Sequence, residues 1–355
     1  MRSCRIALYP GDGIGPEVVA AAVRVLEALQ HELGAFELVM TRFPWGAQYA
    51  ANNGHVAPED YLELLRPFDA ILLGALGDPG RLPDYITLEP IVRLRQAFDQ
   101  YACVRPARLY PGVKSSLAAP GEIDMIVVRE NSEGEYFSCG GRFKQGRPEE
   151  VAVQTAVHTR AGVARILRFG FELAKKRRRR LTMITKSNAL RFGMVMWDEV
   201  LEQVRPEFPD VQVGRLHVDA AAMDFVRRPS QFDVVVASNL FGDILTDLSA
   251  AITGGLGTAA SANLNPERSF PSMFEPVHGS APDIVGQGIA NPTAAILSAA
   301  MMLDWLDLSG AANVLRAAVE RTLLHGQTTP DLGGTLTTAQ MTDQIIHHLT
   351  KTGNA

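Results

Sequence analysis

Two carboxylates spaced one helical turn apart are the first feature of this chain that could do chemistry. Asp243 and Asp247 lie in a segment that follows an apolar run and has the pattern of a helix start. Residues four apart share a helical face, where two bare negative charges would destabilise the helix by about 0.2–0.5 kcal/mol. A divalent cation held by oxygen ligands reverses that sign, and Asp219, which closes another apolar run, is a candidate third ligand. From spacing alone, an Asp243 that favours the helix amino end and a solvated Asp247 are the better explanation of the pattern.

Three arginines, Arg95, Arg105 and Arg129, stand at the ends or edges of apolar segments. Guanidinium groups bind carboxylates through two parallel hydrogen bonds, so three of them would suit a substrate with two carboxylates. Each arginine taken alone is also typical of a protein surface. Tyr136 follows Arg129 by seven residues, and Lys186 directly follows a short apolar run. In open α/β sheets ligands gather beyond the carboxyl ends of strands, where Arg129 and Lys186 are expected.

The loop at residues 278–284, His-Gly-Ser-Ala-Pro-Asp-Ile, is the most distinctive segment of the chain. Its small residues would let the backbone lie against a flat ligand, and Asp283 could accept both hydroxyls of a ribose. The same carboxylate would repel a 2′-phosphate, which favours NAD over NADP. An ordinary surface loop rich in proline and glycine is the alternative interpretation.

A second glycine-rich turn, Gly-Asp-Gly-Ile-Gly-Pro-Glu at residues 11–17, does not match the dinucleotide-binding fingerprint. Its third glycine comes one residue too early, and Pro16 follows it. It is either a tight turn with proline at the first helical position or a turn whose backbone approaches a ligand closely. A classical Rossmann domain is therefore not predicted.

Alternating strands and helices must position these residues. Short continuous apolar runs, typical of strands buried on both faces, span residues 5–9, 68–73, 125–128, 181–185 and 232–237. Helical spacing of apolar residues spans 16–29, 162–174 and 194–204. This alternation predicts an α/β sheet with mainly parallel strands.

The composition predicts an ordinary globular protein. The 355 residues are 46% hydrophobic and 21% charged, enough for roughly two domains. With 34 Lys and Arg against 39 Asp and Glu, the net charge of −5 argues against nucleic acid or an anionic membrane as the main partner. The basic run at 175–180 is therefore expected to be a solvated helix end.

The cysteines and the apolar stretches indicate in which cellular compartment the protein is expected. Cys4, Cys103 and Cys139 have no CxxC spacing, which suits a reducing compartment, and each is predicted to be a small core thiol. The uncharged stretches 248–266 and 284–303 contain Gly, Asn and Pro, so neither predicts a membrane span. The amino terminus has no signal-peptide pattern, and a cytoplasmic protein is expected.

Taken together, these segments resemble the isocitrate/isopropylmalate dehydrogenase family, the metal-dependent β-decarboxylating dehydrogenases. The resemblance extends from the glycine turn at 11–17 to Asp-Leu-Gly-Gly at 331–334. Within the family, residues 128–136, 234–247 and 261–268 resemble the tartrate/D-malate dehydrogenase branch.

The resemblance implies an α/β fold of the isopropylmalate-dehydrogenase type, with two domains and mixed sheets, rather than a classical Rossmann domain. Residues 1–100 plus 254–355 would form a large, discontinuous cofactor-binding domain. Residues 101–253 would form a small domain for dimerisation and for the metal and substrate site.

It also implies substrate and catalytic roles. Arg95, Arg105 and Arg129 would clamp the substrate carboxylates, and Tyr136 would be the general acid. Ile91, one helical turn before Arg95, would present an apolar surface to the substrate. That surface fits an unsubstituted or alkyl-bearing malate better than the third carboxylate of isocitrate. Arg93 would point away from Arg95 if the local helix is regular, whereas a distorted loop could aim it at an extra anionic group, as in homoisocitrate-like substrates.

The implied metal site is shared between two subunits of a homodimer. Asp243 and Asp247 would bind Mg²⁺ or Mn²⁺ in one subunit, and Asp219 would arrive from the other. Lys186, also from the partner subunit, would be the general base for the substrate hydroxyl.

The implied NAD site includes Asn188, which would face the nicotinamide. Its remaining members would be His278, Gly279, Ser280, Ala281, Asp283, Ile284, Asn291 and Asp331. K⁺ is a further candidate cofactor.

The resulting hypothesis is an NAD-dependent enzyme that decarboxylates a 2-hydroxy diacid, D-malate to pyruvate and CO₂, with tartrate also used. A 3-isopropylmalate or homoisocitrate dehydrogenase is the alternative enzyme. A regulatory or RNA-binding relative that uses the run 175–180 is the non-enzyme alternative. For the enzyme, neither a membrane nor a nucleic acid is expected as a partner.

Overall fold

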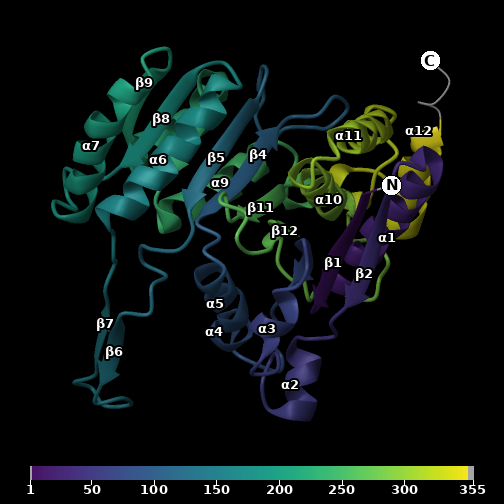
Figure 1. Ribbon diagram of the computed structural model, residues 1–355, viewed down its shortest axis with the longest axis horizontal. Coiled ribbons are helices and arrows are strands. Elements are labelled where there is room, and N and C mark those ends of the chain that lie inside the picture. Colours follow the sequence, from purple (N-terminus) through teal and green to yellow (C-terminus); the bar gives the residue numbers. More distant parts are fainter. Residues whose placement is uncertain (1, 351–355) are drawn as a thin grey trace.

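The computed structural model describes residues 2–350, in which one ten-stranded mixed sheet runs through the molecule (Figure 1). In pairing order its strands are β2 (Phe36–Arg42), β1 (Arg2–Gly11), β3 (Ala70–Ala75), β12 (Ser272–Pro276), β11 (Ala260–Leu264), β4 (Ala102–Arg108), β5 (Asp124–Glu130), β10 (Val234–Ala237), β8 (Arg180–Thr185) and β9 (Gln212–His217). Antiparallel pairing is confined to the middle, at β12–β11, β11–β4 and β4–β5. The outer strands pair in parallel, so the predicted α/β class with mainly parallel strands is confirmed.

The pairing order sorts the chain into two sides. The first five strands in this order, β2, β1, β3, β12 and β11, come from residues 1–100 and 254–355. The other five, β4, β5, β10, β8 and β9, come from residues 101–253. The two sides join where Ala262 of β11 pairs with Val104 of β4. A side chain at this junction can therefore meet residues that are far away in the sequence.

Helices pack against both of these sides, that is, against each of the two groups of strands. On the first side, the packed helices are α1 (Gly15–Leu33), α10 (Thr293–Trp305), α11 (Ser309–Leu324) and α12 (Thr338–Thr350). On the second side they are α6 (Arg160–Lys175), α7 (Gly193–Val204), α8 (Val218–Arg227) and α9 (Asn239–Ile252). Four short helices flank β3 in the sequence: α2 (Ala47–Asn53), α3 (Tyr61–Leu65), α4 (Asp84–Thr87) and α5 (Glu89–Ala97). Helix α10 is buried along most of its length because its side chains are small or apolar on nearly every side.

A thin antiparallel hairpin extends away from the body of the molecule (Figure 1). It consists of β6 (Gly140–Phe143) and β7 (Val151–Gln154), and every residue of both strands is exposed. Its apolar residues include Phe143, Val151 and Val153. An isolated two-stranded hairpin is marginally stable in water.

The burial of the cysteines differs from the prediction at one position. Cys4 and Cys103 are buried as predicted, but Cys139 is exposed. The prediction of a core thiol is wrong at Cys139 because this residue directly precedes the hairpin, which has no packed layer over it.

The basic run at 175–180 is only partly solvated. Lys175 and Lys176 are exposed at the end of α6, as expected. Arg177 instead turns inward and donates from Nε to a carboxylate oxygen of Asp233, 2.8 Å away, and the Asp233 side chain is fully buried. Arg178 donates to the backbone carbonyls of Asp124 and Phe232. Part of the run therefore compensates a buried charge. Within residues 2–350, no helix has both the length and the apolar character that a membrane span requires.

The glycine turn at 11–17 packs against the loop at 278–284. Gly13 has a φ of +58°, and a Cβ added to it would lie 2.1 Å from the carbonyl oxygen of Ser280. That oxygen accepts a hydrogen bond from the backbone N–H of Ile14. Pro16 is the second residue of α1, one position later than predicted. The close approach that the glycines permit is therefore to another loop of the same chain.

We predict that Gly13→Ala destabilises the protein more than Gly34→Ala does. Gly34 has nearly the same φ of +59°, but nothing lies within 4 Å of its added Cβ. Both substitutions carry the left-handed backbone cost of about 1–2 kcal/mol. Gly13→Ala adds an overpacking cost of about 1–3 kcal/mol against Ser280. Urea unfolding at one protein concentration measures the difference, and equal losses in the two variants would contradict it.

Candidate active site

A cavity of about 300 Å³ lies beyond the carboxyl ends of β3 and β12, where the two sides of the sheet meet. Predicted site residues that line it are Ile91, Arg95, Arg105, Arg129, Tyr136, Asp243, His278 and Gly279. They come from both sides of the sheet, so the cavity requires the two sides together.

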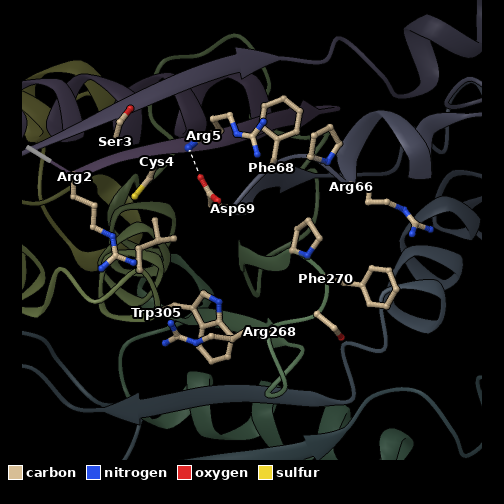
Figure 2. Close-up of a pocket in the computed structure, with 14 residues that line it drawn as sticks. Arg2, Ser3, Cys4, Arg5, Arg66, Phe68, Asp69, Arg268, Phe270 and Trp305 are labelled. Carbon is tan, nitrogen blue, oxygen red and sulfur yellow. Dashed lines mark hydrogen bonds between the residues drawn. The ribbon is translucent and has the colours of Figure 1, made fainter.

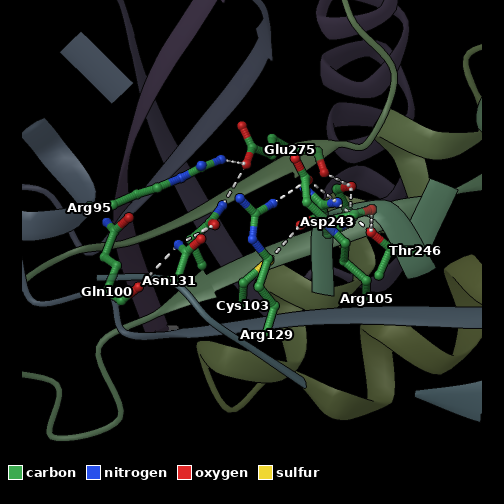
Figure 3. A network of polar contacts seen from close by, with 12 residues as sticks. Arg95, Gln100, Cys103, Arg105, Arg129, Asn131, Asp243, Thr246 and Glu275 are labelled. Carbon is green, nitrogen blue, oxygen red and sulfur yellow. Dashed lines mark hydrogen bonds and ion pairs between the residues drawn. The ribbon is translucent and has the colours of Figure 1, made fainter. Parts of the chain in front are cut away.

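Asp243 is the carboxylate that two arginines of this cavity share (Figure 3). One of its carboxylate oxygens pairs with both Arg129 and Arg105, the latter from Nη1 at 3.1 Å. The other oxygen accepts a hydrogen bond from the Tyr136 hydroxyl at 2.8 Å. Burial opposes ionisation of Asp243, but the two guanidinium groups hold the pKa of the carboxyl below its ordinary value.

The same environment keeps Tyr136 protonated. Burial, and then the negative charge of Asp243, raise the pKa of the Tyr136 hydroxyl above its ordinary value. A phenol that holds its proton at neutral pH can donate it to a developing carbanion, as the predicted general acid must.

Arg129 is fixed by Asn239, the first residue of α9. The Asn239 side-chain oxygen accepts hydrogen bonds from Nε of Arg129 at 2.9 Å and from Nη2 at 2.6 Å. The Asn239 amide donates to the backbone carbonyl of Glu133. Gly242 admits the arginine stem, since a Cβ there would lie 2.7 Å from Cβ of Arg129. Helix α9 therefore holds both the arginine and its carboxylate partner.

Arg105 reaches the same helix from β4. Its Nη1 donates to the Thr246 hydroxyl at 2.6 Å, one helical turn beyond its other partner, Asp243. Burial alone would lower the pKa of Arg105, but nearby carboxylates, Asp243 first among them, raise it. Arg105 is therefore a fixed cation in the wall of the cavity.

Arg95 is held by a buried polar network that the sequence analysis did not identify (Figure 3). Its Nη2 pairs with Oε1 of Glu275 at 2.5 Å, and Glu275 also accepts from Nδ2 of Asn263 at 2.7 Å. Asn131 donates in turn to Oδ1 of Asn263 at 2.9 Å. The sequence signal for this network is a carboxylate at the end of the apolar strand Ser272–Pro276, directly before the loop at 278–284.

The three predicted metal ligands and the predicted base, Lys186, divide into two pairs within one chain. Asp247 lies one helical turn beyond Asp243, and burial, with the charge of Asp243, raises the pKa of Asp247. Asp219 is exposed at the start of α8, where Nζ of Lys186 donates to its carboxylate at 2.6 Å. Across residues 2–350, no three acidic, histidine or cysteine side chains are close enough to bind one ion. Asp243 and Asp247 offer the hard oxygen donors that Mg²⁺ or Mn²⁺ prefers, so this pair fits a partly built cation site.

The predicted NAD residues divide in a similar way. Asn291 donates from Nδ2 to a carboxylate oxygen of Asp331 at 3.0 Å, so these two meet as expected. Nε2 of His278 is buried without a hydrogen-bond partner in the part of the chain that the structure describes, which fits a loop that binds a polar group. Asn188 lies in an exposed turn after β8 and does not line the cavity. The remaining loop residues range from the buried Ser280, through the half-buried Ala281 and Ile284, to the exposed Gly279 and Asp283.

The wall of the cavity next to Arg95 is apolar. It contains Leu88, Ile91 and Val92, the last two from the regular helix α5. Arg93 is exposed and does not line the cavity, as expected for a regular helix.

Comparison with known proteins identifies the family. The model of the family described as isocitrate/isopropylmalate dehydrogenase matches residues 5–345. This chain belongs to that family. The enzyme is 51% identical over 349 residues to a probable tartrate dehydrogenase/decarboxylase from Agrobacterium vitis, with 97% of each chain covered. It is 50% identical over 355 residues to the decarboxylating D-malate dehydrogenase of Escherichia coli, covering 97% of this chain and 98% of that protein.

A solved structure supports the fold of this dehydrogenase. The crystal structure of isocitrate dehydrogenase from Methylococcus capsulatus matches with a TM-score of 0.88 at 36% identity, covering 99% of this chain and all of that one. The predicted isopropylmalate-dehydrogenase-like fold is confirmed, and the protein is an oxidoreductase of the decarboxylating-dehydrogenase kind. Dehydrogenases of this family generally use NAD and a divalent metal.

We predict that Asn239→Ala destabilises this dehydrogenase and weakens substrate binding. The change removes both acceptor contacts to the buried Arg129 guanidinium, at a cost of about 1.5–3 kcal/mol. Chemical unfolding and the KM for the diacid substrate are the measurements. Asn53→Ala is the matched control, since the exposed Asn53 donates only to the Tyr49 carbonyl. Similar effects from both changes would show that Asn239 does not hold Arg129.

Proposed function

We propose that this dehydrogenase oxidises and decarboxylates D-malate to pyruvate and CO₂ with NAD and Mg²⁺ or Mn²⁺, and that it also uses tartrate. The observation that supports this most directly is the convergence of Arg95, Arg105, Arg129 and Tyr136 in one cavity that contains Asp243. Three guanidinium groups match the two carboxylates of a four-carbon diacid. The names of the two similar enzymes support the same reaction.

The apolar wall bears on which diacid fits. Leu88, Ile91 and Val92 offer no donor for a third carboxylate, which disfavours isocitrate. The exposed position of Arg93 outside the cavity likewise disfavours homoisocitrate. The same wall could accept an alkyl group on the substrate, so 3-isopropylmalate is the second candidate substrate.

The roles of the residues follow from their positions. A divalent cation, when bound, would polarise the substrate hydroxyl, and NAD would accept the hydride. The arginines would hold both carboxylates, so the carbon that bears the hydroxyl is presented in one orientation. Lys186 would take the hydroxyl proton. After the C–C bond to the departing CO₂ breaks, Tyr136 would protonate the carbon that keeps the electron pair.

Completing the site requires a second copy of the chain. Asp219 and Lys186 bind each other instead of reaching Asp243, so we propose that each pair faces the partner subunit's complementary pair in a homodimer. Exposed apolar residues support an interface here: Met223 and Val226 on α8 are 56% and 42% exposed, and Ile244 on α9 is 56% exposed. The exposed hairpin β6–β7 offers a second apolar surface for the partner.

The domain boundaries belong to the same proposal. Residues 1–100 with 254–355 would form the large cofactor-binding domain, and residues 101–253 would form the small dimerisation domain. The sorting of the strands into two sides of one sheet supports this division.

We predict NADH formation with D-malate in the presence of Mn²⁺ and NAD⁺. Absorbance at the NADH band is compared for D-malate, tartrate, 3-isopropylmalate, isocitrate and homoisocitrate, and chelation of the metal should abolish it. Turnover of 3-isopropylmalate or homoisocitrate without turnover of D-malate would overturn the substrate assignment. Lys186→Ala should abolish reduction but leave NAD binding in place, and surviving activity would exclude Lys186 as the base.

We predict that two inactive variants restore activity when mixed. Lys186→Ala and Asp243→Ala should each be inactive as homodimers. In a mixed dimer, one site combines an intact Asp243 with the partner subunit's intact Lys186. Random subunit exchange at equal amounts should therefore recover about a quarter of the wild-type activity. No recovery, once mass spectrometry shows that mixed dimers form, would place both residues in one subunit's site.

A further inference from the structure

A second cavity, of about 430 Å³, lies beside the amino ends of β3 and β12 (Figure 2). Its lining comes from β1, from the segments that directly precede the parallel strands β3 and β12, and from Trp305 and Leu306 at the end of α10. The active-site cavity is lined by the carboxyl ends of β3 and β12. The two cavities are therefore separated by the length of these strands.

Arginines dominate the lining of this second cavity. The lining contains four arginines, Arg2, Arg5, Arg66 and Arg268, and one carboxylate, that of Asp69. Asp69 accepts a hydrogen bond from the backbone N–H of Arg5 at 2.6 Å. Positive charge therefore exceeds negative charge among the lining residues, although Asp307 and Glu63, outside the lining, pair with three of these arginines.

The existing partners of these arginines compensate them only weakly. Arg2 and Arg268 share one carboxylate, that of Asp307, and the three side chains are 48%, 48% and 56% exposed. Arg66 pairs with Glu63 at 3.2 Å, and these side chains are also exposed. Exposed pairs of this kind contribute about 0–1 kcal/mol each, so an anionic ligand could displace them at small cost. Among residues 2–350, the Arg5 guanidinium has no ion-pair partner.

Aromatic rings hold two of the guanidinium groups in place. Arg268 lies over the Trp305 ring, 4.5 Å from its centroid, and Arg66 lies over the Phe270 ring at 5.2 Å. Figure 2 shows these two arginines on different sides of a common hollow. Ring contacts restrict the long side chains before a ligand arrives, which lowers the entropy cost of binding.

We propose that this cavity binds a small polyanion with at least two anionic groups, of the polyphosphate or polycarboxylate class. Guanidinium groups on separate walls fit separated anionic groups better than one compact monoanion. A volume of about 430 Å³ lies within the range of small-ligand sites. The site is independent of the proposed reaction because none of its residues lines the active-site cavity.

Calorimetric titration of the full-length protein with pyrophosphate and, separately, with citrate tests this inference. The buffer contains no divalent metal, which both probes chelate, and about 50 mM salt, because screening weakens exposed charge pairs. We expect saturable binding of one probe or both, with one site per chain. Pyrophosphate alone would identify phosphate compounds, and citrate alone would identify polycarboxylates. The absence of saturable binding by either probe would overturn the proposal.

Substitutions locate the site. Arg5→Gln and Arg66→Gln should each weaken binding at least about tenfold, the effect of losing one charged hydrogen bond. Arg24→Gln is the matched control, because Arg24 is an exposed arginine of α1 outside the cavity, and it should leave binding unchanged. Arg95→Gln tests the active site and should also leave binding unchanged, with the unfolding midpoint reporting that the variant is folded. A loss caused by Arg24→Gln or Arg95→Gln, with Arg5→Gln still binding, would overturn the assignment.

Discussion

Charge compensation around Asp243 is the constraint on which the rest of the site depends. Two buried guanidinium groups bind one of its oxygens, and the Tyr136 hydroxyl binds the other. Burying three charged groups this closely is unfavourable unless each has partners, and Asn239 and Thr246 provide the remaining acceptors. The carboxylate is therefore held in its ionised form at the place where a cation and a diacid are proposed to meet.

The topology of the sheet explains how these groups meet. Antiparallel strands in the middle of the sheet join its two sides, whose outer strands pair in parallel, and the residues of the cavity come from both sides. The same arrangement places a second, arginine-rich cavity beside the amino ends of β3 and β12. Apolar side chains of α8, α9 and the hairpin stay exposed, and they are the surface assigned to the proposed dimer interface.

The difference between the two acidic pairs has a physical origin. Asp243 is compensated within its own chain by arginines, whereas Asp219 is compensated by Lys186 at an exposed position. A lysine amine is a flexible point charge, so it can leave an exposed carboxylate with little loss of stability. A buried arginine that binds a carboxylate through its rigid guanidinium group cannot leave so easily. In the proposed homodimer, Asp219 and Lys186 are thus the residues that would change partners.

Local pattern in the sequence predicted strands β1, β3, β5, β8 and β10 and helices α1, α6 and α7, because apolar periodicity depends on neighbouring residues. It did not predict the middle strands β4, β11 and β12, and the family was identified from the combined motifs. Arg105, Arg129 and Asp243 were identified individually. The sequence could not show that both arginines bind Asp243, since Arg129 and Asp243 are 114 positions apart. Nor could it show that Arg95 binds Glu275, that Arg177 compensates the buried Asp233, or that Cys139 is exposed. Those contacts were decided by strand order and by the position of the hairpin, because only tertiary structure brings distant charges together or leaves a residue without a covering layer.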